Sequence, residues 1–493
     1  MHPSIIRTVL LALLAATTVS AARLSREDSY TIETVAFPPE VPPEVGALGF
    51  NEAGELVVAL RRSDVLIAKP TADPGAFQWH RFARGLHNAC GMHVVSRREL
   101  VISQMAELTR IVDTDGDGVA DRYENLCSDW GLSGNYHETA HLTPDGNGGY
   151  FVAPGTASHN GPVFYNIRGR YSKIGRRGRN YSAANWRGWV LHVDADGKVT
   201  PWCSGFRMHN GIFIDRAGNL WAGDNQGDWK ATTPFYHLEK GRFYGHPSSL
   251  IWNSAWDGGD PLLMSPDRID ALRTPAAVLL PHDSMNSSAS EPIQIPDDTF
   301  GPYGGQILLP DNNGTRISRL MLEKVDGQYQ GACALWFDGH GLHSGNNRVC
   351  FSPDQRTLYV GQTARGWGKL SEGIQRITWR GQAPFDVLTM NLMPGGFRLR
   401  FTRPLAENVE QNGTYSLKTY HYRNTSNYGG DKLDLQELRP RRIVRIDDRT
   451  LEVQVDGLRA GGQVYELNLD LRDFDGNGLW AKTFCYTINR LAR

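Results

Sequence analysis

The chain has 493 residues, more than one ordinary domain needs and enough to bury sizeable hydrophobic cores. Its 52 Lys and Arg residues nearly balance its 53 Asp and Glu residues, so no overall electric field favours nucleic acid or a membrane surface. The balance excludes binding driven by net charge, so arguments about ligands must rest on local charge.

The first 21 residues predict export. Arg7 precedes an apolar run over residues 9–16, and small residues follow up to Ala21, which is the pattern of a cleaved signal peptide. The run is shorter than the about 20 apolar residues that span a bilayer, although an uncleaved anchor is the alternative. We therefore expect signal peptide 1–21, a periplasmic or extracellular location, and no transmembrane segment after cleavage.

Residues 28–383 carry repeated short strands. A turn with Asp or Asn followed by an alternating strand occurs at 51–58, 144–152, 215–221 and 353–360. The first two turns lie 93 residues apart and the last two 138, about two and three units of the ~46 residues that a four-stranded blade occupies. The pattern predicts an all-β fold, a six-bladed β-propeller with a long inserted loop after residue 144. Seven blades, or a β-sandwich with long insertions, are the alternatives.

Residues 113–124 satisfy the twelve-residue calcium loop, with glycine at position 6. Clustered carboxylates repel one another unless a hard cation neutralises them. The predicted calcium ligands are Asp113, Asp115, Asp117, the carbonyl of Val119, Asp121 and Glu124. The alternative is a solvated acidic turn.

His137 is the candidate general base, because imidazole titrates near neutral pH. His137 and His141 could face one metal on a helix, but on a strand they would lie about 13 Å apart, too far for that. A hydrogen-bonded structural histidine is the alternative.

Residues 168–179 hold six cations and no acid. They lie in the predicted inserted loop. An anionic ligand, such as a uronate or a sulfated glycan, is one interpretation of this segment, and a solvated loop paired with acids elsewhere is the other.

Polar residues gather in segments that look like loops between blades, at 204–211, 224–229 and 344–348. Propeller blades bring such loops to one mouth of the central channel. Mixed Arg, Asn, Asp and Trp side chains suit a sugar or a polar cofactor, since they combine planar stacking with directed hydrogen bonds. The candidate residues are Arg207, Asn210, Asp228 and Arg348. Polar networks that only stabilise loops are the alternative.

Residues 385–493 alternate cleanly, for example over 397–401, 450–455 and 465–469, and predict a small immunoglobulin-like β-sandwich. The turn at 473–478 lacks the downstream glutamate of a calcium loop, so we expect an ordinary turn there. Among the six cysteines no Cys-x-x-Cys occurs, which disfavours a clustered zinc site. The sequence is compatible both with a Cys333–Cys350 disulfide and with buried free thiols.

Three segments carry a family resemblance: 207–211 (Arg-Met-His-Asn-Gly), 224–228 (Asp-Asn-Gln-Gly-Asp) and 241–247 (Gly-Arg-Phe-Tyr-Gly-His-Pro). Their succession resembles the glucose/sorbosone dehydrogenase-like six-bladed propellers. The closer likeness is to secreted propellers described as membrane-bound-dehydrogenase-like, and 113–121, 187–190, 322–331 and 359–363 extend it.

The resemblance implies pyrroloquinoline quinone and calcium as cofactors, a histidine that takes the proton of the sugar, and arginines and a lysine that hold the anionic cofactor. Arg207 matches the family's first arginine and Asp228 its acid, while Arg348 lies one position from its late arginine. His137 would be the base, two positions from the family's histidine, and the lysine has no counterpart.

The leading hypothesis is an exported sugar dehydrogenase that oxidises an aldose or oligosaccharide, with His137 as base and Arg207 and Arg348 as electrostatic anchors. A second hypothesis is a non-catalytic glycan-binding or scaffolding propeller that has kept the fold. The third is carbohydrate lyase chemistry, β-elimination with His137 or Tyr181 as base. All three hypotheses have a carbohydrate as the partner, which can be an anionic carbohydrate, and none of them involves nucleic acid.

Overall fold

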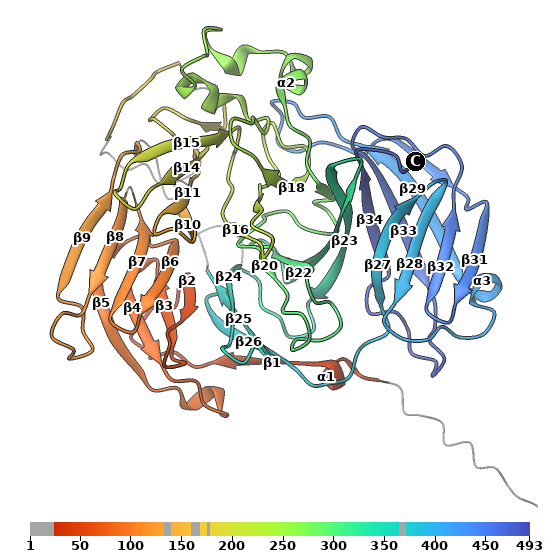
Figure 1. Ribbon diagram of the computed structural model, residues 1–493, viewed down its shortest axis with the longest axis horizontal. Helices are drawn as coiled ribbons and strands as arrows, with labels where there is room; N and C mark the ends of the chain where they lie inside the picture. The colour runs from red at the N-terminus through yellow and green to blue at the C-terminus, as the bar shows by residue number, and fades with distance from the viewer. Residues whose placement is uncertain (1–23, 106, 133–139, 159–167, 175–177, 364–370) are drawn as a thin grey trace, which may run out of the picture.

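The computed structural model describes residues 24–105, 107–132, 140–158, 168–174, 178–363 and 371–493 (Figure 1). The predicted signal peptide 1–21 lies outside these ranges. The regular secondary structure of the described residues is almost entirely antiparallel strand, and none of their helices is long and apolar enough to cross a membrane.

Six blades of four strands each are arranged around a common centre (Figure 1). The blades, each written from its inner strand outwards, are β2-β3-β4-β5, β6-β7-β8-β9, β10-β11-β14-β15, β16-β17-β18-β19, β20-β21-β22-β23 and β24-β25-β26-β1. The inner strand β2 contacts both β6 of the next blade and β24 of the last, and β10 contacts β6 and β16. The N-terminal strand β1 pairs with β26, so the last blade combines both ends of the propeller. The predicted six-bladed propeller is confirmed.

The blade strands have the following bounds: β1 Tyr30–Val35, β2 Val45–Phe50, β3 Leu56–Leu60, β4 Arg62–Ala68, β5 Trp79–His87, β6 Gly91–Ser96, β7 Glu99–Gln104, β8 Glu107–Val112, β9 Arg122–Cys127, β10 Ala140–Pro144, β11 Tyr150–Pro154, β14 Trp189–Val193, β15 Val199–Ser204, β16 Ile212–Ile214, β17 Leu220–Gly223, β18 Thr233–Leu238, β19 Val278–Leu280, β20 Ile293–Gln294, β21 Ile307–Pro310, β22 Arg316–Val325, β23 Gln328–Asp338, β24 Asn346–Phe351, β25 Thr357–Gln362 and β26 Gly373–Trp379.

The repeated turns of the sequence join the first two strands of a blade. Asn51, Asp145 and Asp215 each accept hydrogen bonds from the backbone amides two and four residues later, and Asp354 accepts one from the amide two residues later. Such side chains stabilise a tight turn locally. Gln355 takes the left-handed backbone position, φ 58°, that Gly54 and Gly218 hold in the equivalent turns. The one turn without the glycine therefore keeps the same conformation.

Two long insertions lie between blade strands. The two-stranded sheet of β12 (Ala157–Ser158) and β13 (Asn180–Tyr181) lies between β11 and β14, in the interval where the sequence predicts an inserted loop. A second long connection joins β18 to β19. It contains the short helices η2 (Pro247–Trp252), η3 (Pro261–Leu263) and α2 (Pro266–Leu272), and the repeat spacing did not reveal it. Two further short helices are α1 (Arg26–Ser29) and η1 (Pro74–Ala76).

The C-terminal part is a sandwich of the sheets β27-β28-β32-β31 and β34-β33-β29-β30, as predicted. Apolar side chains of both sheets form one buried core. Strand β34 also pairs with β23, so the second sheet continues the fifth blade as an eight-stranded sheet. The bounds are β27 Val387–Met393, β28 Gly396–Phe401, α3 Val409–Asn412, β29 Thr414–His421, β30 Leu433–Leu438, β31 Arg442–Asp447, β32 Thr450–Gln454, β33 Gln463–Asp470 and β34 Thr483–Ile488.

All six cysteines are free thiols, so the structure does not contain the Cys333–Cys350 disulfide considered from the sequence. Instead, Cys333 lies opposite Cys485 across the β23–β34 pair, and Cys350 lies opposite Tyr359.

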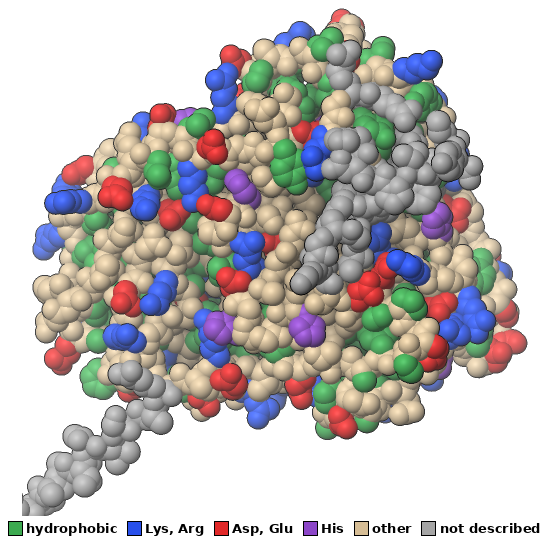
Figure 2. Space-filling model, turned by 180° about the vertical axis from the view of Figure 1, so that it is seen from behind, with side chains coloured by type: hydrophobic (Ala, Val, Ile, Leu, Met, Phe, Trp, Pro, Cys, Tyr) green, Lys and Arg blue, Asp and Glu red, His purple; other side chains and the backbone are tan. Residues whose placement is uncertain are grey.

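Acidic and basic side chains are interspersed on the face shown in Figure 2. This distribution agrees with the near-zero net charge of the chain.

Candidate functional site

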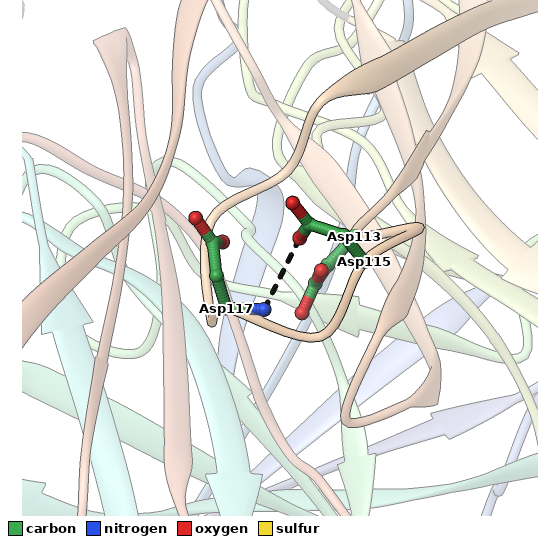
Figure 3. Close-up of side chains that lie close together, drawn as sticks. All are labelled: Asp113, Asp115 and Asp117. Carbon is green, nitrogen blue, oxygen red and sulfur yellow. Dashed lines mark hydrogen bonds between the residues drawn. The ribbon is translucent and has the colours of Figure 1, made fainter.

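The acidic loop between β8 and β9 brings Asp113, Asp115 and Asp117 together (Figure 3). One carboxylate oxygen of each lies within 4.8 Å of the others. Because Ca²⁺ binds oxygens at about 2.3–2.6 Å, two ligands on opposite sides of one ion are about this far apart. Burial opposes ionisation of Asp113, but the Gly116 and Gly118 amides and the Arg98 charge outweigh it and lower the pKa of that carboxyl. The three aspartates therefore fit a calcium ion.

The remaining predicted ligands are placed differently. Asp121 accepts hydrogen bonds from the amide and hydroxyl of Thr114, which closes the loop. Val119 is 49% exposed, and its amide donates to Asp117.

Glu124, the predicted twelfth ligand, lies apart from the three clustered aspartates. It lies on β9, where its carboxylate is 3.0 Å from Arg122 and 3.8 Å from Arg110. Strand β9 leaves the turn at Arg122, and a strand rises about 3.3 Å per residue, so Glu124 is carried away from the loop.

Arg348 joins four blades near the propeller axis. Its guanidinium is fully buried and donates to the carbonyls of Gly46, Cys90 and Asn210 at 2.7–2.8 Å. The Asn210 side chain also lies in this cluster, where it donates to Asn347. The sequence therefore correctly places Arg348 and Asn210 in one cluster. However, every nitrogen of Arg348 already donates to the protein itself.

His141 belongs to the same axial cluster. It is 4% exposed, lies 3.4 Å from Glu291 and accepts a hydrogen bond from the Ile212 amide. Burial lowers the pKa of His141, although Glu291 opposes this. The contacts with Glu291 and Ile212 thus fix the His141 ring in the axial cluster. His137 lies outside the described residues.

Arg207 and Asp228 form a buried ion pair on the loops 205–211 and 224–232, which together we call the loop face. The Arg207 Nε donates to Asp228 at 2.8 Å, and both side chains are about 5% exposed or less. The guanidinium packs so closely on Gly227 that a Cβ there would overlap it. These loops precede and follow neighbouring strands of the fourth blade, so the blade geometry brings the two residues together.

Asp228 has two further partners. The Asn180 amide donates to it at 3.0 Å, and the His246 Nε2 lies 3.4 Å away. Burial opposes ionisation, but His246 and Arg207 outweigh it and lower the pKa of Asp228 below its usual value. The lowered pKa favours the ionised carboxylate, which holds Arg207 through the ion pair.

Lys230 forms a second buried pair beneath this one. Its Nζ lies 3.1 Å from Asp224 and donates to the carbonyls of Gly205 and Tyr244. Asp224 in turn accepts from the amide of Arg207 at 2.9 Å. Lys230 was not among the residues that the sequence indicated, and its only signal is its place two residues after Asp228, in a loop with two aspartates.

The C-terminal sandwich contributes an aromatic ring to the loop face. The loop 422–432, between β29 and β30, lies against 227–231, with the Trp229 amide donating to Thr425 at 2.7 Å and the Gly429 amide to Gly227 at 3.0 Å. The Tyr428 ring centre lies 5.2 Å from the Arg207 guanidinium carbon and 4.4 Å from that of Arg179. Tyr428 is 51% exposed. An accessible aromatic ring thus stands over a rigid, charge-paired arginine.

The basic stretch is partly visible. Arg170 lies over the rings of Trp186 and Trp252, and residues 175–177 are outside the described ranges. Tyr181, the alternative base for lyase chemistry, is 5% exposed and packs in a small apolar cluster.

No protein-family model matches the chain, and no curated protein matches it. Among solved structures, it is similar to the iodide structure of a Trichoderma reesei carbohydrate-active enzyme of Family AA12, with 11% identity, a TM-score of 0.51, and coverage of 71% of this chain and 96% of that one. Two others are the holo quinone domain of Coprinopsis cinerea pyranose dehydrogenase (13%, TM-score 0.49, 71% and 97%) and the quinone-bound aldose sugar dehydrogenase of Streptomyces coelicolor (12%, 0.45, 71% and 99%). At these identities the likeness concerns the fold, and the predicted resemblance to glucose/sorbosone dehydrogenase-like propellers is confirmed at that level.

Proposed function

We propose that the protein is an exported carbohydrate-binding propeller of the sugar-dehydrogenase fold, and that the carbohydrate binds at the loop face beside Tyr428. The half-exposed Tyr428 ring next to the buried Arg207–Asp228 pair is the observation that carries this proposal. Sugar rings present apolar C–H faces and many hydroxyls, and an aromatic ring beside fixed polar groups satisfies both.

One cation at the edge of the loop face supports an acidic sugar as the ligand. The guanidinium carbon of Arg179, in the basic inserted segment, lies 4.4 Å from the centre of the Tyr428 ring. Guanidinium groups bind carboxylates or sulfates with paired hydrogen bonds. We therefore expect uronate or sulfated oligosaccharides to bind more tightly than neutral ones, with an affinity that falls as salt rises.

The quinone of the resembling dehydrogenases does not fit the two arginines that the sequence assigned to it. A carboxylated cofactor needs cationic donors that are available, whereas Arg348 is saturated by blade carbonyls and Arg207 is paired with Asp228. Lys230 is likewise paired with Asp224. Among the described residues, the buried cations of the loop face and axis hold the fold together.

Replacing Tyr428 by alanine is expected to weaken carbohydrate binding about tenfold, because an aromatic contact contributes about 1 kcal/mol or more. Titration calorimetry against neutral, uronate and sulfated oligosaccharides measures this. Tyr428→Phe keeps the ring and should bind like the wild type. Phe474→Ala, which removes another exposed aromatic side chain in the 473–478 turn, is the control and should also bind like the wild type. Equal binding by Tyr428→Ala and the wild type would refute the proposed site.

Oxidation of an aldose or oligosaccharide is the second candidate function. The resemblance of 207–211, 224–228 and 241–247 to glucose/sorbosone dehydrogenase-like propellers supports it, and His137 remains its proposed base. Sugar-dependent dye reduction with added pyrroloquinoline quinone and calcium, lost in His137→Ala, would establish oxidation. Saturable binding without dye reduction would support the binding function alone.

We also propose that the 113–121 loop binds structural calcium. Millimolar Ca²⁺ should raise the melting temperature of the protein by about 2–4 °C, because a ligand that binds only the folded state stabilises it. Asp115→Asn and Asp117→Asn should remove the shift, measured by differential scanning fluorimetry. Asp475→Asn, in the similar 473–478 turn, is the matched control and should keep it. An unchanged shift in the first two variants would place the ion elsewhere.

A further inference from the structure

The junction between the propeller and the sandwich contains two facing thiols. Cys333 of β23 lies directly opposite Cys485 of β34, and both are fully buried. Directly opposed residues of antiparallel strands have Cα atoms about 4.5–5.5 Å apart, inside the roughly 4.4–6.8 Å span of disulfides. The backbone register therefore already permits a bond between the two sulfur atoms.

We propose that Cys333 and Cys485 form a disulfide in the exported protein, which covalently ties the fifth blade to the C-terminal sandwich. The inference rests on the proposed export, since disulfides persist in oxidising compartments. The strand pair β23–β34, over Gly331–Ala334 and Phe484–Thr487, is what makes the two sheets continuous, and the cysteines lie within it. The bond would thereby fix the sandwich, and with it the Tyr428 loop, against the propeller.

The reaction is a thiol–disulfide exchange. A reactive disulfide of an oxidoreductase in the export compartment accepts two electrons and becomes a dithiol, while the two thiols lose their protons and form one S–S bond. The Cys333 thiol and burial raise the pKa of Cys485 well above its ordinary value, which disfavours the reactive thiolate in the folded state. Both thiols are also fully buried in the folded chain and out of reach of another protein, so the exchange takes place before β34 packs against β23.

The expected consequence is stability that reductant removes. The two residues lie about 150 positions apart, and closing so long a loop restricts the unfolded chain strongly. Wild-type protein that is reduced while unfolded and refolded with its thiols kept reduced should melt about 5 °C below the oxidised protein. Cys485→Ser should melt near the reduced wild type and show no response to reductant, whereas Cys350→Ser, the control in β24, should respond like the wild type.

Mass spectrometry of the exported protein, alkylated during denaturation without reductant, gives the direct test. The expected result is a cross-linked pair of peptides containing Cys333 and Cys485, with the other four cysteines alkylated. Mature protein with a processed N-terminus but with both residues alkylated would overturn the disulfide. Failure of export is separate, because it would show as an unprocessed N-terminus. The readout needs no variant, so a misfolded Cys485→Ser would not affect it.

Discussion

Replacing Asp228 by alanine is expected to abolish carbohydrate binding at the loop face and to lower the free energy of unfolding by about 3–5 kcal/mol. Asp228 is the acid that fixes Arg207, at 2.8 Å, and both side chains are almost completely buried. Without it, Arg207 would be a buried cation with no charged partner, and the Asn180 amide would also lose its acceptor. The part of the loop face that contacts Tyr428 would then rearrange.

Urea unfolding and binding titration measure the two effects separately. Asp297→Ala is the matched control, because it breaks the exposed Arg216–Asp297 ion pair, which solvent screens. The control should leave both unfolding and binding nearly unchanged. An Asp228→Ala protein that unfolds and binds like the wild type would show that the pair is not needed for the site.

Asp386→Ala is expected to have the largest effect on the junction between the propeller and the sandwich. It should lower the free energy of unfolding by about 3–5 kcal/mol. Asp386 precedes β27, and its carboxylate lies 2.9 Å from Arg319 of β22 with neither side chain exposed. The Tyr303 hydroxyl also donates to it at 2.7 Å. Burial raises the pKa of Asp386, although Arg319 and Tyr303 oppose this. Removing the acid would leave an unpaired buried arginine between the two parts.

The same urea experiment tests this prediction, with the Asp470→Ala variant of the exposed Lys482–Asp470 pair as control. A single transition at clearly lower urea, or two separate transitions, is the expected result. A wild-type curve for Asp386→Ala would mean that the apolar core of the sandwich alone holds it to the propeller.

The blade repeats could be predicted from the sequence because their signals are local. Asn51, Asp145 and Asp215 bond to amides two and four residues away, so the turn and the chemistry that makes it lie in the same short segment. The acidic loop is local in the same sense, and three of its predicted ligands converge. Arg207 and Asp228 were candidates from two neighbouring loops of one blade, but the sequence indicated two ligand contacts and not their ion pair.

The role of Arg348 could not be predicted, since its partners are backbone carbonyls of residues as distant as Gly46, and a carbonyl has no sequence signal. Tyr428, which follows Arg207 by more than 200 residues in the sequence, reaches it from the sandwich, which is joined to the fifth blade through β23 and β34. Glu124 satisfied the motif but lies on a strand instead of a helix. Each of these outcomes depends on tertiary geometry.

Hydrogen exchange of the mature protein with and without a bound uronate oligosaccharide tests most directly whether the loop face is the binding site. We predict slower exchange in 224–231 and 423–430, where the Trp229 and Gly429 amides join the two loops, and no change in β22 (Arg316–Val325). Saturable binding with protection confined to other segments, or no binding of any oligosaccharide tested, would contradict the account.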